Sequence, residues 1–204
     1  MVTAHVPATL PAPLQISESE KIQAGRFVRE ADKKSYAFRH HLLRMLLSGW
    51  LHQMPEALVF SSNPFGKPFV ENSRFQFNMS RSGSQLCFYF GPHDGGVDIE
   101  RRRDPSAYRD VARRHFHPEE QKMLKDDDDF FVIWTRKEAL LKATGTGLSS
   151  GLHHFDCSRE QVISGGHTYH LRTYLTQESI LSICLPVPIP ELKLFEPDIG
   201  RLQL

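Results

Sequence analysis

The segment Phe130–Leu148, FFVIWTRKEALLKATGTGL, constrains the fold of this chain more than any other. It opens with the apolar run Phe130–Trp134, which can place the start of a helix in a hydrophobic core. The residues that follow favour helix formation up to Gly145, where glycine can end the helix in a left-handed conformation. The sequence therefore predicts a long helix whose first turns are buried.

One face of this predicted helix carries a mixture of apolar and charged side chains. Trp134, Glu138, Leu141 and Lys142 lie three or four residues apart, so they share that face. Glutamate before lysine at this spacing is also the order that an ordinary surface ion pair prefers. The helix alone favours the surface pair, and a second acidic stretch, GVDIE at Gly96–Glu100, makes a functional site the stronger interpretation.

Asp98 and Glu100 are two residues apart on a predicted strand, so their side chains point to the same face. Like charges on one face repel each other, and a divalent cation would relieve that repulsion. Carboxylate oxygens at this spacing suit Mg²⁺, with Glu138 as a third ligand and Lys142 as the partner of a phosphate or hydroxyl group. The structural alternative is an exposed strand end whose acids pair with Arg101–Arg103.

Composition limits the classes of function. The chain has 204 residues, enough for one large domain or two small ones in close contact, and its formal net charge is +1. This balance argues against strong non-specific binding to nucleic acid. Three widely spaced cysteines form no C-x-x-C motif, which fits a reducing compartment. No apolar run reaches the roughly 18 residues of a membrane span, and Met1–Glu20 lacks the features of a signal peptide. We expect a cytoplasmic protein that binds neither nucleic acid nor membranes.

The order of predicted elements indicates the α+β class, because strands and helices do not alternate regularly. Residues 1–17 read as a loose leader or an irregular first strand, and 186–197 as an irregular tail. We interpret Gly91–Gly96 as a hairpin connection and Pro118 as a helix break. The predicted helices and strands cover residues 18–54, 75–80, 86–90, 97–100, 104–125, 167–175 and 179–185.

Two further segments have the chemistry of phosphate contacts. The turn SRSG places Ser80 and Arg81 beside Gly83, and Lys67 lies between Gly66 and Pro68. By itself, each segment is more often a structural turn than a binding site.

Taken in chain order, however, the fragments form a series. The motifs are G-K-P at Gly66–Pro68, F-N-x-S-x-S-G at Phe77–Gly83, G-V-D-I-E at Gly96–Glu100, F-x-x-x-E at Phe116–Glu120 and W-x-x-K-E-A-x-x-K-x-x-G-x-G-L at Trp134–Leu148. This series resembles the 4′-phosphopantetheinyl transferases, and it is closer to the surfactin-synthetase-activating type than to the small trimeric type. The similarity spans about Phe27 to Leu152.

The resemblance implies an α+β fold of two similar α/β halves related by a pseudo-twofold axis, with the active site in the cleft between them. The halves would be residues 1–92, on the coenzyme A side, and 93–204, with the metal ligands and the central helix. It implies transfer of the 4′-phosphopantetheine arm of coenzyme A to a serine of an apo acyl or peptidyl carrier protein. Mg²⁺ or Mn²⁺ would be the cofactor. We expect a monomer, because one chain builds the whole cleft.

Residue roles follow from the resemblance, position by position. The implied metal ligands are Asp98, Glu100 and Glu138. The implied contacts to coenzyme A are Lys142 and, at the adenine end and the phosphates, Lys67, Pro68, Ser80 and Arg81. Glu120 would help to deprotonate the acceptor serine, with Lys142 as its competitor for that role and the better stabiliser of charge.

Three points remain open from the sequence. Glu120 follows the break at Pro118, where an acid is also expected as a helix-capping residue. Arg81 stands where the family usually has histidine, and Thr146 where a lysine is common. The rival functions are a metal-dependent phosphodiesterase or nuclease, which also needs clustered carboxylates, and a non-catalytic module that binds coenzyme A or a carrier.

Overall fold

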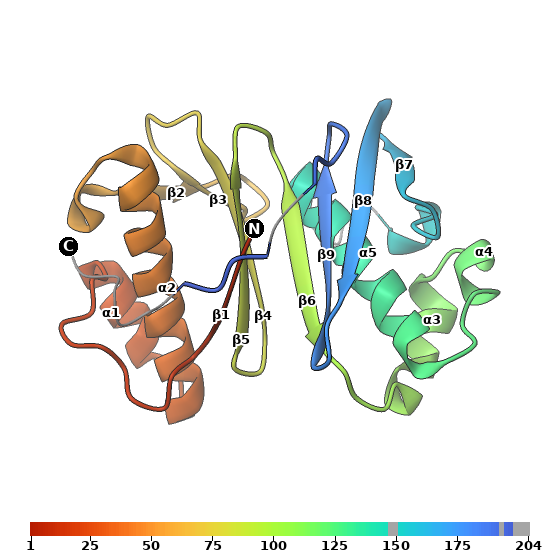
Figure 1. Ribbon diagram of the computed structural model, residues 1–204, viewed down its shortest axis with the longest axis horizontal. Coiled ribbons are helices and arrows are strands. Elements are labelled where there is room, and N and C mark those ends of the chain that lie inside the picture. The colour runs from red at the N-terminus through yellow and green to blue at the C-terminus, as the bar shows by residue number, and fades with distance from the viewer. Residues whose placement is uncertain (147–150, 192–193, 198–204) are drawn as a thin grey trace.

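A computed structural model describes residues 1–146, 151–191 and 194–197 of the chain. These residues form two antiparallel sheets, each covered on its outer face by one long helix (Figure 1). The α+β class is therefore confirmed. No helix within the described residues is both long enough and apolar enough to cross a membrane.

The first sheet has the order β1-β5-β4, with a separate β2-β3 hairpin beside it. Antiparallel pairing joins all three strands of this sheet. The helices and strands of this part are β1 (Val2–His5), α1 (Glu18–Gly25), α2 (Glu30–Leu51), β2 (Phe60–Ser62), β3 (Pro68–Val70), β4 (Gln76–Ser82) and β5 (Gln85–Gly91).

The second sheet has the order β6-β9-β8-β7, again antiparallel throughout. The short helices α3 and α4 lie beside α5, beyond this sheet (Figure 1). The elements of this part are β6 (Gly96–Arg101), α3 (Arg109–His115), α4 (Pro118–Gln121), α5 (Asp127–Thr144), β7 (Gln161–Ser164), β8 (His167–Leu175) and β9 (Ser179–Leu185).

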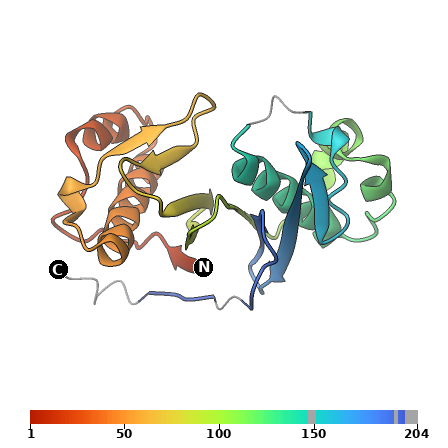
Figure 2. The same ribbon diagram turned by 90° about the horizontal axis from the view of Figure 1, so that it is seen from above.

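The two sheets pack face to face, which gives the layer order α2, first sheet, second sheet, α5. Leu86 and Phe88 of β5 pack against α2, whereas Cys87 and Tyr89 pack against the second sheet. Because successive strand residues point to opposite faces, this central strand is buried on both sides and has no polar face. Figure 2 shows the two parts side by side, and Phe195, which follows β9 in the chain, pairs with Val2 of β1.

Most element positions agree with the sequence pattern, but two turns do not. Residues Ser80–Ser82 of the predicted SRSG turn belong to β4, because they pair with β5, and the link Gly91–Gly96 is not a hairpin. We predicted a hairpin there, whereas β5 and β6 belong to different sheets and do not pair. The link carries the chain from one sheet to the other. The turn residues were recognised correctly, but turn chemistry cannot tell whether the strands that it joins share a sheet.

The long helix α5 ends at Gly145 as the sequence predicts, but it starts at Asp127, before the predicted Phe130. Asp126 and Asp129 form a reciprocal capping box at its N-terminus, and Gly145 ends it with φ 64°. Phe130, Phe131 and Ile133 are all buried in one apolar cluster. The last two residues of the predicted motif, Gly147 and Leu148, lie outside the described residues.

Gly96 allows β6 to lie directly against α5. A Cβ atom at this position would come within 2.0 Å of the carbonyl oxygen of Ala139 and 2.5 Å of the backbone nitrogen of Ala143. Both are backbone atoms of α5, so a flexible side chain cannot move aside to make room. The distance between the strand that carries Asp98 and the helix that carries Glu138 therefore depends on this glycine.

We predict that Gly96→Ala lowers the free energy of unfolding by about 1–3 kcal/mol or more, the cost of overpacking a tight contact. Gly49→Ala is the matched control, because nothing lies within 4 Å of a Cβ there and alanine favours the helix. Urea unfolding curves of the two variants test this. A Gly96→Ala protein as stable as Gly49→Ala would contradict it.

Candidate functional site

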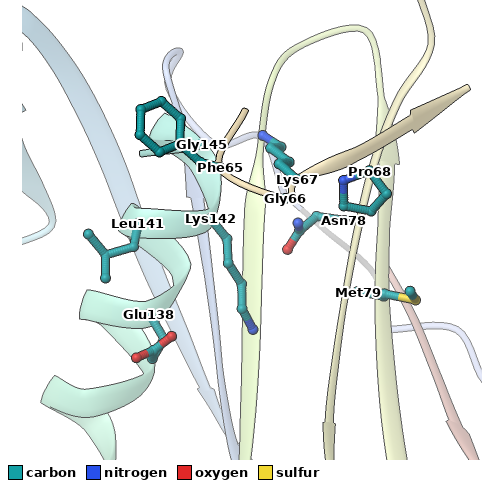
Figure 3. A pocket seen from close by; sticks show the side chains of 10 residues that line it. All are labelled: Phe65, Gly66, Lys67, Pro68, Asn78, Met79, Glu138, Leu141, Lys142 and Gly145. Atoms are coloured by element: carbon teal, nitrogen blue, oxygen red, sulfur yellow. The ribbon is translucent and has the colours of Figure 1, made fainter. Parts of the chain in front are cut away.

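A pocket of about 270 Å³ lies where the β2–β3 turn and β4 face α5. In Figure 3, Gly66, Lys67, Pro68 and Asn78 lie opposite the helix. Glu138, Leu141, Lys142 and Gly145 line it from α5. The pocket is therefore built by both parts of the chain, as the resemblance implied for the cleft.

Beside the pocket, the edge strands β4 and β6 are joined through side chains. Every second residue of β4 reaches across: Asn78 Oδ1 accepts from the Val97 N–H at 2.9 Å, and Ser80 Oγ donates to Asp98 at 2.6 Å. Ser82 Oγ donates to Glu100 at 2.7 Å. The period of two along a strand places these three polar side chains on one face, toward β6. These contacts fix where the two acids of the GVDIE motif lie.

Asp98 and Lys142 form a charged pair at the centre of this contact between β4 and β6. Lys142 Nζ donates to Asp98 Oδ1 at 2.7 Å, to Ser80 Oγ at 2.9 Å and to the Val97 carbonyl at 3.2 Å. These bonds use all three hydrogens of the ammonium group. Within the described residues, Asp98 Oδ2 is buried and has no hydrogen-bond partner. Burial raises the pKa of Asp98, although the charge of Lys142 opposes that shift. One carboxylate oxygen thus remains unsatisfied.

Glu138 and Glu100 complete the acidic group. Burial, followed by the negative charges of Asp98 and Glu100, raises the pKa of Glu138. The three carboxylates are thus close enough to repel one another. Glu100 already accepts from Ser82 and from Arg103 Nη1, the latter at 2.9 Å.

A ready-made metal site with three carboxylates, as we predicted, is absent from the part of the chain that the structure describes. Lys142 holds one oxygen of Asp98, and Arg103 holds Glu100, which confirms part of the strand-end alternative. Nevertheless, the unsatisfied Asp98 Oδ2 and the mutual repulsion of the acids are what a bound cation would relieve. The carboxylate oxygens of Asp98, Glu100 and Glu138 are ligands of the kind that a hard divalent cation prefers. In this structure, however, the three carboxylates do not converge on one point.

Lys67 has a structural role that the sequence did not reveal. Its Nζ donates to Asp94 at 2.9 Å and to the backbone carbonyls of Ala143 at 3.2 Å and Gly95 at 3.4 Å. Asn63 Nδ2 similarly donates to the Gly145 carbonyl at 3.2 Å. The β2–β3 turn thus caps the C-terminal end of α5 from outside the helix. Lys67 and Pro68 line the pocket, but the amino group of Lys67 is already occupied.

Arg81 does not join the group around Asp98. Its neighbours on β4, Ser80 and Ser82, point toward β6, so Arg81 points to the opposite face, toward α2. There, Arg81 Nη2 lies 3.6 Å from Asp32 Oδ1. The prediction placed Ser80 and Arg81 together at the phosphates, whereas the strand directs them to its two sides.

The role predicted for Glu120 requires a correction. Its side chain is fully buried, and its Oε2 lies 2.8 Å from Lys137 Nζ, itself fully buried. The carboxylate also accepts from the backbone N–H groups of His117 at 2.6 Å and Cys157 at 2.7 Å. A fully buried carboxylate that already accepts from these three groups is not open to an acceptor serine. The capping alternative is confirmed, because Glu120 and His117 form a capping box at α4.

Lys137 is the partner that sequence reasoning missed. It follows Phe130 and Ile133 at spacings of seven and four residues, so it falls on the buried stripe of α5. A lysine at a buried helix position requires a buried hydrogen-bond acceptor. The position of Lys137 in the sequence could therefore have predicted a buried ion pair. Lys137 also donates to the carbonyls of Leu152 and Phe155, both at 2.7 Å.

We predict that Glu120→Gln lowers the free energy of unfolding by about 3–5 kcal/mol, because it leaves the buried charge of Lys137 uncompensated. Glu119→Gln is the matched control, since Glu119 pairs with Lys122 at the exposed surface and should change stability by less than about 1 kcal/mol. Urea unfolding at neutral pH compares the two. Equal stability of both variants would mean that the buried pair does not support the fold.

Both parts of the chain match known protein families. Residues 9–88 match the family model for the N-terminal part of 4′-phosphopantetheinyl transferases, and residues 95–183 match that of the 4′-phosphopantetheinyl transferase superfamily. A putative 4′-phosphopantetheinyl transferase of Synechocystis is 34% identical over 148 residues, 68% of this chain and 60% of the relative.

Two other relatives carry the same description. The 4′-phosphopantetheinyl transferase HetI of Nostoc is 32% identical over 145 residues, 66% of this chain and 61% of the relative. The 4′-phosphopantetheinyl transferase Sfp of Bacillus subtilis is 29% identical over 153 residues, 72% of this chain and 67% of the relative. The chain thus spans about 60% of the length of the first two relatives. Because two models of one family match successive parts of it, this chain belongs to the 4′-phosphopantetheinyl transferase superfamily.

Proposed function

We propose that this protein transfers the 4′-phosphopantetheine arm of coenzyme A to a serine of an apo carrier protein, releasing 3′,5′-ADP. The observation that carries the proposal is the Asp98–Lys142–Ser80 group beside a pocket that both parts of the chain build. It combines a phosphate-binding ammonium group with carboxylates that suit a divalent cation, as the transfer of a phosphate-linked group requires.

Asp98, Glu100 and Glu138 would hold Mg²⁺ or Mn²⁺. A cation there would supply charge neutralisation on the pyrophosphate of coenzyme A and on the departing 3′,5′-ADP. The unsatisfied Asp98 Oδ2 and the raised pKa values of Asp98 and Glu138 support this assignment. The contacts of Glu100 with Ser82 and Arg103 are both made by its Oε2, so its Oε1 can take part without breaking either of them.

Lys142 has two successive tasks in this proposal. Before the donor binds, its ammonium group balances the buried charge of Asp98 with all three hydrogens. When a pyrophosphate enters, Lys142 turns toward it and stabilises the charge that develops during transfer. The side chain of Lys142 is 28% exposed, so its end can reach the pocket.

Glu138 is the better candidate to receive the proton of the acceptor serine, now that Glu120 is buried elsewhere. Its carboxylate lines the pocket and makes no hydrogen bond to any described residue (Figure 3). A pKa raised by burial and by neighbouring acids also brings a carboxylate closer to the range that suits a general base.

We further propose, from the motif series, that the protein is of the surfactin-synthetase-activating type and that its halves, residues 1–92 and 93–204, are related by a pseudo-twofold axis. Lys67 and Pro68 would lie at the adenine end of coenzyme A. The near-neutral charge and the two-sided pocket support a cytoplasmic monomer without nucleic-acid or membrane partners.

The direct test is to incubate the protein with coenzyme A, Mg²⁺ and an apo carrier protein, and to measure the carrier's intact mass. We expect a gain equal to one phosphopantetheine group, together with release of 3′,5′-ADP. A carrier whose acceptor serine is replaced by alanine should gain nothing. Hydrolysis of coenzyme A without a mass gain would indicate a phosphodiesterase. Binding of coenzyme A without any reaction would indicate a non-catalytic module.

The role of the acids gives a second prediction. Asp98→Asn keeps the size of the side chain but removes its charge, so we expect turnover to fall by roughly 10²-fold or more, the scale for losing a main electrostatic stabiliser. Mn²⁺ binding, measured by electron paramagnetic resonance, should weaken in parallel while the protein stays folded.

Asp110→Asn is the control for that experiment, because Asp110 is an exposed carboxylate that pairs with Arg113 on α3. It should bind Mn²⁺ and turn over like the unmodified protein. Wild-type turnover in Asp98→Asn, or full activity in excess chelator, would contradict the metal assignment.

A further inference from the structure

A second pocket, of about 340 Å³, lies where β1 and the start of β5 face the β8–β9 turn. Thr3 and His5 line it from β1, Gln85 from β5 and Thr176–Ser179 from the second part of the chain. In Figure 1 the β8–β9 turn lies at the lower end of the sheets, whereas the β2–β3 turn lies at the upper end. Of the described residues, none lines both this pocket and the one beside Lys142.

Gln85 is the unsatisfied residue of this second pocket. It is only 6% exposed, and its Nε2 donates to Glu178 Oε2 at 2.9 Å. Its Oε1 is buried, and no described residue donates a hydrogen bond to it. The opposite orientation of the amide would turn its oxygen toward a carboxylate, so the contact with Glu178 settles which atom is left over. A buried acceptor without a donor is costly, and a ligand that brings a donor would remove that cost.

Strand alternation turns Gln85 into the space between the two sheets. Cys87 and Tyr89, two and four residues further along β5, pack against the second sheet, and Gln85 shares their face. His5 is the register partner of Gln85 on β1 and lies on the same face. Gln85 therefore reaches toward the β8–β9 turn, where it meets Glu178.

The charge of the second pocket is negative. Its ionisable side chains are Glu178, Glu196 and His5, and no lysine or arginine of the described residues lines it. Arg102 contacts the same turn, where its Nε donates to a backbone carbonyl at 2.8 Å, but its charge is paired with Asp128. The pocket thus offers two carboxylates and a free acceptor, without a cation of its own. A suitable ligand brings positive charge and hydrogen-bond donors.

A primary ammonium group on an alkyl chain has this chemistry. Its three N–H donors can serve Gln85 Oε1 and the carboxylate of Glu178 together. The alkyl chain can lie on Ile99 and Leu194, which also line the pocket. A metal ion fits less well, because the described residues contain no group of three or more histidine, cysteine or acidic side chains placed to hold one. The second carboxylate, Glu196, favours a chain with an amino group at each end.

We propose that the second pocket binds an aliphatic amine, held by Gln85 Oε1 and the carboxylate of Glu178. This site goes beyond the proposed function and does not depend on it, because no step of the transfer uses either residue. Gln85 belongs to the first part of the chain and Glu178 to the second, so a bound amine would strengthen the contact between the two parts. The same ammonium group occurs in a free diamine and in a lysine side chain, and the test has an arm for each.

The test is isothermal titration calorimetry of the unmodified protein with putrescine and, separately, with Nα-acetyl-lysine methylamide. We expect saturable binding of at least one of them, and none of butanediol, which has the same chain length as putrescine but no charge. Binding of putrescine alone would identify free amines as the ligand, and binding of the lysine derivative alone would identify lysine side chains. Binding of neither would overturn the inference.

Two variants locate the bound amine. Gln85→Met removes the acceptor at similar length, and Glu178→Gln removes the charge but keeps an oxygen that can accept from Gln85. We expect each to weaken amine binding roughly 10- to 100-fold, the scale of hydrogen bonds to charged groups. Glu178 is exposed, so Glu178→Gln tests the site even where Gln85→Met does not fold. Glu119→Gln is the matched control, because it removes a surface acid that does not line the pocket, and it should change nothing.

The acids beside Lys142 are the competing site for an amine. Asp98→Asn should bind the amine like the unmodified protein, since Asp98 does not line the second pocket. Loss of binding in Asp98→Asn, or unchanged binding in both Gln85→Met and Glu178→Gln, would overturn the inference. If the unmodified protein modifies a carrier but binds neither amine, the transferase function stands and only the amine site is wrong.

Discussion

The carboxylate of Asp98 is the charge on which the arrangement of this protein depends. It is buried where two sheets pack face to face, and an ionised acid there is costly without a partner. Lys142 supplies that partner from α5, and Ser80 supplies a hydrogen bond from β4. Three elements thus meet at the side chain of Asp98: β6, which carries it, α5 and β4. The two opposite charges both belong to the second part of the chain, and the first part adds the hydroxyl group of Ser80.

The helix that carries Glu138 and Lys142 is held on two sides by other elements. At its C-terminal end, Lys67 and Asn63 bond its last carbonyls from the β2–β3 turn. On its buried side, Lys137 pairs with Glu120 and with loop carbonyls. Buried ion pairs add little net stability, but breaking them is expensive, so they fix one arrangement over others. Small errors of position would matter for the transfer reaction that we propose, and these contacts restrict them.

The two lysines of the K-E-A-x-x-K motif show how differently one motif is used. Lys137 is fully buried and pairs with Glu120, whereas Lys142 is 28% exposed and pairs with Asp98 beside the pocket. Helical spacing places them on different faces, five residues apart. A residue that matches a family pattern can therefore serve either the fold or the chemistry, and only its surroundings decide which. Glu120 is a second example, because its motif position suggested catalysis whereas its contacts are structural.

The sequence by itself determined the α+β class, the C-terminal end of α5 and the candidate acids, because helix periodicity, caps and strand alternation are local properties. It also placed Asp98 and Glu100 on one face of a strand through their period of two. Only the tertiary structure decided that β5 and β6 lie in different sheets, that Arg81 faces α2 and that Glu120 is enclosed. These outcomes depend on which distant segments pack together, and a turn or an isolated acid carries no information about its partner. The same reason hid the contacts of Lys67 and Lys137, whose acceptors lie on segments distant in the chain.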